Sequence, residues 1–170
     1  MDDKLLVRYD PVHFDSKGKL LFELKHALPG DVGYDLPVVV DERLKVQPNR
    51  SYFINLVERW FDIPPHGYAE VPCGLAVKVP DDCWGNIKAR SSTGWRRRLA
   101  VNEAVIDSQY VGPLFILVFN PSNEPVRIKA GEKLAQLILI PKKREPVAVE
   151  VRKELPQTVR NESGFGSSGM

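Results

Sequence analysis

The chain has 170 residues, of which 43% are hydrophobic and 27% charged, and its formal net charge at pH 7 is +2. This length allows one domain with a proper core, or one domain with a tail. No apolar run approaches the roughly 18 residues that a membrane span needs, and the acidic start Met1-Asp2-Asp3 does not resemble a signal peptide. The composition therefore predicts a globular protein of the cytoplasm and argues against membrane and secreted proteins.

The cysteines, histidines and basic residues suggest no metal site and no nucleic-acid groove. Cys73 and Cys83 match no zinc spacing and the histidines are scattered, so we expect reduced thiols and no metal site built from protein ligands alone. The 24 basic and 22 acidic side chains are too evenly balanced for a dedicated nucleic-acid binder. The basic run Trp95–Arg98 is a small patch, which we expect to be solvated or to contact another subunit.

Short runs of β-type residues, separated by turn residues, cover most of the chain. Pro64–Gly67, Pro80–Asp82 and Pro121–Asn123 are turns of this kind. Short strands with breaks about every 8–12 residues predict an all-β barrel or jelly roll. The predicted strands are Lys4–Arg8, Tyr68–Val71, Leu75–Val79, Trp84–Lys88, Leu114–Asn120, Val126–Ile128, Leu134–Ile140 and Val147–Arg152.

One stretch, residues 51–61, departs from the strand pattern. Its apolar residues recur at helical spacing, Ser51 or Asn49 could cap a helix there, and Pro64 would end it. A strand is the alternative, because Tyr52-Phe53-Ile54 has high β-propensity. We predict a short helix inside an extended insertion, residues 37–62. The apolar positions are Tyr52, Phe53, Leu56, Val57, Trp60 and Phe61.

The last residues, Pro156–Met170, are rich in glycine and serine and contain one aromatic residue, Phe165. Such a segment cannot pack a core of its own, so we expect a flexible arm that follows a domain of residues 1–155. A single Phe among glycines, with Arg160 five residues earlier, suits an arm that closes on a ligand.

Two segments carry residues suited to an anion. Pro29–Leu36 is a glycine-rich turn that leads to a carboxylate, Asp35. In Ala89–Gly94, Arg90 precedes Ser91 and Ser92. The planar guanidinium matches phosphate oxygens, and hydroxyls with exposed amides complete an anion cradle. Either motif is a weak signal when taken alone.

Two further segments bring a carboxylate and an amide. In Val101–Gly112, Asp107 follows apolar strand residues and Tyr110 comes three positions later, although an Asp that caps a turn is an equally good interpretation. In Lys129–Ile138, Gln136 interrupts an otherwise apolar strand. A buried amide must find partners, because leaving it without them costs about 1–3 kcal/mol.

Taken in this order, the four segments and the arm resemble the five motifs of the trimeric deoxyuridine triphosphatases, the dUTPases. The resemblance runs from about residue 29 to the C-terminus. The chain departs from the family at Ala89, where proline is usual, and in the arm, where Asn161 and Ser163 replace glycines. The resemblance implies a distorted jelly-roll β-barrel that assembles as a homotrimer with active sites at the subunit interfaces.

The resemblance also implies hydrolysis of dUTP to dUMP and pyrophosphate, which limits uracil incorporation into DNA and supplies dUMP for thymidylate synthesis. Asp107 would hold and deprotonate the water that attacks the α-phosphorus. Mg²⁺ would be bound by the triphosphate and waters, with no direct protein ligand and with Asp35 as a contact through water. Tyr110 would exclude a 2′-hydroxyl, and Phe165 would stack on uracil. The implied substrate-binding residues are Arg90, Ser91, Ser92, Ala104, Val105, Ile106, Tyr110, Phe115, Gln136, Arg160, Phe165, Gly166, Ser167 and Ser168.

Two alternatives belong to other functional classes. A dCTP deaminase has a similar fold and a similar Arg-Ser-Ser segment, but it needs a carboxylate in the strand after the third motif, and Leu114–Phe119 contains no acid. A regulatory binding protein on the same scaffold would use residues 37–62 as the surface for a protein partner, with aromatic residues such as Trp60 as anchors.

Overall fold

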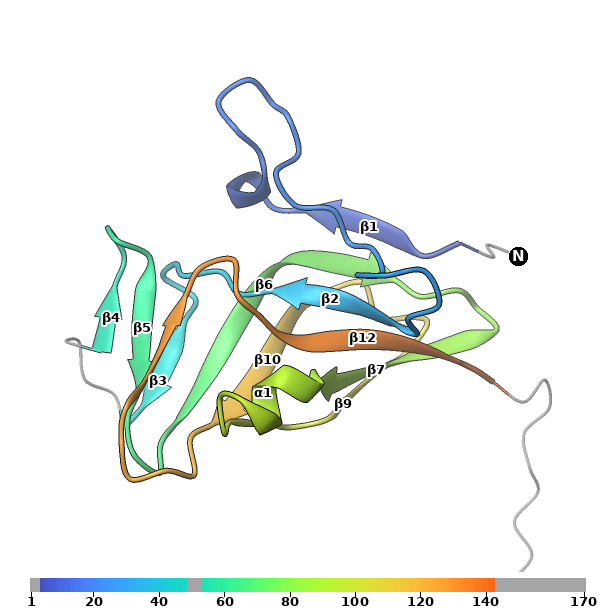
Figure 1. Ribbon diagram of the computed structural model, residues 1–170. Helices are drawn as coiled ribbons and strands as arrows, with labels where there is room; N and C mark the ends of the chain where they lie inside the picture. The colour runs from blue at the N-terminus through green and yellow to red at the C-terminus, as the bar shows by residue number, and fades with distance from the viewer. Residues whose placement is uncertain (1–3, 49–52, 143–170) are drawn as a thin grey trace, which may run out of the picture.

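The computed structural model describes residues 4–48 and 53–142, which form three antiparallel sheets around one hydrophobic core (Figure 1). The first sheet has the order β1–β6–β10–β8, with β3 also paired to β6; the second has the order β2–β12–β7–β9, and the third β11–β5–β4. This arrangement confirms the predicted all-β, jelly-roll-like class. The strands are β1 Leu6–Tyr9, β2 Gly33–Pro37, β3 Lys45–Gln47, β4 Ile54–Asn55, β5 Trp60–Ile63, β6 Tyr68–Lys78, β7 Cys83–Ala89, β8 Ala100–Val101, β9 Ala104–Ile106, β10 Pro113–Phe119, β11 Val126–Lys129 and β12 Lys133–Pro141; η1 is Pro11–His13 and α1 is Ser91–Trp95.

The core is built from alternate residues of the strands. In β10, Leu114, Ile116 and Val118 are buried, while Phe115 and Phe119 on the opposite face are exposed. This alternation follows from the period of two in a strand and gives the sheet one apolar inner face. The other strands add large side chains to the same cluster, including Phe61, Ile63, Leu75, Ile87, Ile128 and Leu137.

Strand β6 continues through a segment where the sequence predicts a break. Its 11 residues join the two predicted strands Tyr68–Val71 and Leu75–Val79. Gly74 has φ +67, and a Cβ there would lie 2.6 Å from Nε2 of buried His13. A positive φ is readily available only to glycine, so Gly74 lets the strand bend. The register with β10 shifts at the same place, between Pro113 and Phe115.

The predicted helix at residues 51–61 is wrong over the part that the structure describes. Strands β4 and β5 form a hairpin here instead, at the left of Figure 1. Strand β11 pairs with β5 along its whole length. In the turn, the backbone N–H of Glu58 donates to Asn55 Oδ1 (2.9 Å). Tertiary pairing with β11 thus overrides the local helical spacing: Phe61 is fully buried, while Val57 is 93% exposed at the turn.

Two other predictions from the sequence concern the thiols and the membrane. Cys73 and Cys83 are free, and complete burial raises the pKa of the Cys73 thiol to about 12. In the described part of the chain, no helix has the length and hydropathy to span a membrane.

Candidate functional site

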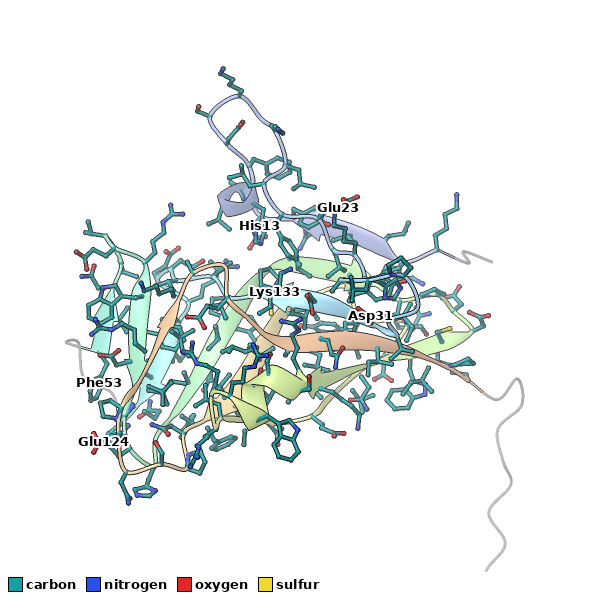
Figure 2. All side chains as sticks on the ribbon, in the orientation of Figure 1. His13, Glu23, Asp31, Phe53, Glu124 and Lys133 are labelled. Carbon is teal, nitrogen blue, oxygen red and sulfur yellow. The ribbon has the colours of Figure 1, made fainter. Side chains whose placement is uncertain are left out.

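A cluster of opposite charges lies where β2, β12 and the end of β7 meet. The carboxylate Oδ1 of Asp35 is 2.8 Å from Arg90 Nε, and its Oδ2 is 3.4 Å from Lys133 Nζ. Asp35 is 5% exposed, whereas Arg90 and Lys133 are partly open to solvent. Figure 2 labels Lys133 beside β2 and β12. Two cations against one carboxylate leave one net positive charge, so this group is suited to an anion.

Gln136 lies beside this charged group, and its side-chain amide has the hydrogen-bond partner that we expected from the sequence. It is opposite Asp35 in β2 and opposite Lys88 in β7. Its Nε2 donates to the Ala89 carbonyl (3.3 Å). A Cβ at Gly33 would collide with Oε1 of Gln136, so only glycine at position 33 leaves room for this amide. Paired residues share a face of the sheet, so Gln136 and Asp35 project from the same side.

The short helix α1 follows Arg90 directly and presents both serines of the Arg-Ser-Ser segment in its first turn. Arg90 precedes it in an extended conformation, with its backbone N–H donating to the Leu134 carbonyl (3.1 Å). Thr93 is buried and donates from Oγ1 to the same carbonyl (2.6 Å). The helix is therefore tied to β12, which holds Ser91, Ser92 and the guanidinium of Arg90 at one place.

The connection from β9, in the second sheet, to β10, in the first, carries Asp107 and Tyr110. Asp107 is exposed, and its carbonyl accepts a hydrogen bond from the Tyr110 N–H (3.0 Å). Tyr110 donates from its hydroxyl to the Pro113 carbonyl (2.9 Å). A Cβ at Gly112 would lie 2.5 Å from that hydroxyl oxygen, so the ring folds closely over the glycine. Asp107 therefore sits in a tight, internally bonded turn.

Two further predicted residues, Ala104 and Phe115, line a hollow of about 330 Å³ on the outer face of β10 and β6. Val105 is exposed and Ile106 buried on β9, which pairs with β7. The hollow is lined by Tyr68, Glu70, Asn102, Ala104, Phe115, Ile116, Leu117 and Phe119.

Within one chain, the structure does not bring the Arg-Ser-Ser segment at Arg90 and the turn at Asp107 together. Ile106 pairs with Gly85 near the start of β7, whereas Arg90 follows the end of β7. Five residues of strand at about 3.3 Å each put these ends about 17 Å apart. Asp107 extends past the start of β7, because β9 runs antiparallel to it. The predicted base and the predicted phosphate ligands thus occupy opposite ends of one strand.

Some predicted residues cannot be placed, and one contributor was missed. Arg160, Phe165, Gly166, Ser167 and Ser168 lie outside the described residues. Lys133 was not predicted from the sequence, although it lies inside the fourth motif. Its closeness to Asp35 depends on the pairing of β12 with β2, which no local pattern reveals.

The basic run Trp95–Arg98 is partly used within the chain. Arg97 pairs with Glu132 at 2.9 Å, and it also donates to the carbonyl of Arg127. Trp95 is exposed. The charge on this face is therefore lower than the sequence alone suggests.

Fold and charge together define a class: an antiparallel β protein in which Asp35, Arg90 and Lys133 form a group with net positive charge. The comparisons give the particular family. The family described as dUTPase matches residues 56–169. The chain is 32% identical over 169 residues to the deoxyuridine 5'-triphosphate nucleotidohydrolase of Arabidopsis thaliana, covering 94% of this chain and 89% of that protein. The chain belongs to the dUTPase family.

Other relatives agree with this assignment. The deoxyuridine 5'-triphosphate nucleotidohydrolase of Haemophilus influenzae is 31% identical over 147 residues, covering 85% of each chain. Among solved structures, a Staphylococcus bacteriophage 80alpha dUTPase with dUpNHpp has a TM-score of 0.72 at 20% identity, covering 99% of this chain and 100% of that one. A mutant dUTPase from phage phi11 of S. aureus, described with a structural Mg(II) ion, has a TM-score of 0.64 at 18% identity, covering 89% and 99%. These two structures support the fold.

Proposed function

We propose that this chain hydrolyses dUTP to dUMP and pyrophosphate. The observation that carries the proposal is the ion pair of Asp35 with Arg90, beside Lys133, in a chain of the dUTPase family. A group with one net positive charge, next to two serine hydroxyls, suits a triphosphate. The reaction would limit uracil incorporation into DNA and supply dUMP for thymidylate synthesis.

Arg90, Ser91 and Ser92 are the proposed phosphate ligands. The Arg90 Nε is held by Asp35, which orients the guanidinium and leaves its terminal nitrogens for phosphate oxygens. One of these, Nη1, lies at the limit of hydrogen bonding (3.5 Å) from the Lys133 carbonyl and can exchange that weak contact for an anion. Gln136 supports this region by tying β12 to the Ala89 carbonyl.

Asp107 is the proposed general base, and the connection between β9 and β10 is the proposed nucleoside site. A carboxylate exposed in a tight turn can accept a proton from water that attacks the α-phosphorus, and such catalysis typically contributes 10²–10⁴-fold. Backbone groups of Ala104, Val105 and Ile106 would read uracil, with Phe115 nearby. The Tyr110 ring would fill the space of a 2′-hydroxyl.

We propose that the active site is completed between subunits of a homotrimer. The support is the distance between the two groups: about 17 Å of β7 separates the Arg90 end from the Asp107 end, and strand spacing fixes this span. One α-phosphorus cannot contact both ends of a single strand. A neighbouring copy related by rotation can bring its Asp107 to the Arg90 of the first chain.

Magnesium fits this site as an ion carried by the substrate. Among the described residues, no group of three or more His, Cys, Asp or Glu side chains could hold a metal. Asp35 Oδ2 is buried and accepts no hydrogen bond from the described residues, so it can accept one from a water bound to the ion. When bound, Mg²⁺ supplies charge neutralisation for the triphosphate and keeps much of its water shell.

The remaining predictions stay proposals. Residues 1–155 are proposed as one domain and residues 156–170 as an arm, in which Arg160 contacts phosphates, Phe165 stacks on uracil, and Gly166, Ser167 and Ser168 close over the site. The cytoplasm is the proposed location, in keeping with two free cysteines. A protein partner at residues 37–62, with aromatic residues such as Trp60 as its anchors, also stays a prediction.

The test is release of pyrophosphate from dUTP, UTP, dTTP and dCTP, each with Mg²⁺. We expect dUTP to be strongly preferred. No turnover of dUTP would overturn the proposal, and ammonia released from dCTP would favour the deaminase. Strand β10, which follows the third motif, contains no acid among Pro113–Phe119, and this favours the hydrolase.

A further inference from the structure

The position of the Asp107 carboxylate is set by the backbone of the turn that carries it. Within residues 4–48 and 53–142, the Asp107 carboxylate has no hydrogen-bond or ion-pair partner. The Tyr110 N–H bond to the Asp107 carbonyl shapes the turn from one side. A second contact that fixes the turn would therefore also fix the carboxylate.

Ser108, the next residue, makes that second contact. It is polar but only 5% exposed, and its hydroxyl accepts a hydrogen bond of 2.5 Å from Lys142 Nζ. Lys142 follows the end of β12, and its own backbone N–H donates to the Asp82 carbonyl (2.7 Å). The ammonium also donates to the Asp81 carbonyl (3.2 Å). One lysine thus joins the Asp107 turn to the turn that precedes β7.

These contacts differ from those of an ordinary surface lysine. An ammonium on a long flexible stem is normally solvated and mobile, because holding it in one rotamer costs side-chain entropy. Here the backbone and the ammonium are both bonded, and one acceptor is a buried hydroxyl. Charge-assisted bonds of this kind are about twice as strong as neutral ones. On the other side, Lys78 Nζ pairs with Asp81 Oδ1 (2.6 Å), so the turn to which Lys142 is bonded is itself anchored.

We propose that Lys142 is a positioning residue for the reaction, which acts through Ser108 to hold the Asp107 carboxylate where the attacking water binds. The inference rests on the proposed function, because it assigns Asp107 as the base. In this role Lys142 contacts neither the attacking water nor the substrate. If Asp107 is held less firmly, kcat falls. KM should change little, because the phosphate ligands that govern it lie at the other end of β7.

Two variants remove the donor and the acceptor of the hydrogen bond between Lys142 and Ser108. Lys142→Met keeps the aliphatic stem without the donor, and Ser108→Ala removes the acceptor. We expect each to lower kcat for dUTP about tenfold with KM within about twofold. The double variant should lose no more than either single variant, because both break the same bond. Lys142→Arg, which keeps a charged donor, should recover at least about threefold in kcat.

The matched control is Lys45→Met, which removes an exposed lysine paired with Glu70 at 3.2 Å. It should keep the kcat of the wild type. The pH profile of kcat separates positioning from a direct effect of charge: positioning lowers the plateau but leaves the acid limb in place. If the acid limb of the kcat profile shifts by about half a pH unit or more, Lys142 acts through its charge, and the proposal is overturned.

Additive losses in the double variant, or a kcat equal to that of the wild type in either folded single variant, would also overturn it. Should Lys142→Met fail to fold, the kcat of Ser108→Ala decides alone. The wild type is assayed first. Absence of dUTP turnover there refutes the proposed function, whereas wild-type turnover with unaffected variants refutes only the role of Lys142.

Discussion

The carboxylate of Asp35, in β2, lies 2.8 Å from the guanidinium of Arg90, which follows β7. The two strands are not neighbours, since β12 lies between them. The ion pair therefore crosses β12, and Asp35 orients a guanidinium that is distant from it in the sequence. Lys133 joins the pair from β12 itself.

Asp35→Asn should weaken the hold on Arg90 while keeping the size of the side chain. Hydrogen bonds to charged groups contribute about 1.5–3 kcal/mol, so we expect kcat/KM for dUTP to fall about 10–100-fold. Steady-state pyrophosphate release measures this. Asp62→Asn is the matched control, because it weakens a similar pair with Arg127 (2.8 Å) between the paired strands β5 and β11. A loss no larger than that of the control would remove Asp35 from this role.

Asp107→Asn should abolish hydrolysis without abolishing binding. Without a general base we expect kcat to fall at least about 100-fold, while a non-hydrolysable dUTP analogue still binds. Glu124→Gln, an exposed carboxylate near the start of β11 labelled in Figure 2, should behave as the wild type. Near-normal turnover of Asp107→Asn in a clean preparation would contradict the assignment.

Mixing two inactive variants tests the site shared between subunits. Arg90→Ala removes the functional side chain near the end of β7, and Asp107→Asn the one near its start. After dissociation and random reassembly of equal amounts, about a quarter of the sites should combine an intact Arg90 with an intact Asp107. We expect about that fraction of wild-type activity. Failure to recover any, with mixed assemblies verified by mass, would mean that each chain uses both residues by itself.

Tyr110→Ala should relax the choice of sugar. The ring packs over Gly112 and is held by its bond to the Pro113 carbonyl. Without the ring, we expect the ratio of kcat/KM for UTP to that for dUTP to rise at least about tenfold. Tyr110→Phe keeps the ring and should keep the selectivity. An unchanged ratio in the alanine variant would place sugar discrimination elsewhere.

Arg43→Met should lower stability in a pH-dependent way. Burial raises the pKa of the Asp41 carboxyl, but hydrogen bonds from Arg43 outweigh it and hold this pKa below its usual range. Arg43 also pairs with Asp10 at 2.7 Å. A depressed carboxyl pKa stabilises the fold above the unfolded-state value of about 3.9, and this stability is lost as pH falls through the folded-state value.

We therefore expect Arg43→Met to lose about 1–3 kcal/mol at pH 7 and progressively less below about pH 4. Denaturant unfolding at several pH values measures the difference. Arg127→Met removes a more exposed arginine and should cost less stability than Arg43→Met does. A difference between Arg43→Met and wild type that stays constant from pH 7 to about pH 3 would contradict the linkage.

Patterns that depend on one strand were predictable from the sequence. The run of β-type residues in β10 and the turns at Pro80 and Pro121 locate strands without knowledge of their partners. The hairpin of β4 and β5 was missed because its stability comes from pairing with β11, more than 60 residues later in the chain. In β6, the bend at Gly74 looked like an end because the sequence does not show that β10 shifts register to match it.

The short motifs of the candidate site could be predicted from the sequence, but the side-chain contacts between its strands could not. Arg90, Asp107 and Gln136 belong to short local patterns. The contacts of Lys133 with Asp35 and of Lys142 with Ser108 depend on the order β2–β12–β7–β9, and no local pattern encodes that order. The same order separates Arg90 from Asp107, which composition and spacing could not reveal.

In the homotrimer that we propose, that separation would make activity depend on protein concentration. In the assembly that we propose, a newly made chain carries both ends of an active site and can use neither until other copies bind. Specific activity would then be constant in concentrated solution and fall on dilution below the dissociation constant of the trimer. A cell that makes only a few copies would hydrolyse disproportionately little dUTP, so expression level would act as a threshold switch rather than a linear control.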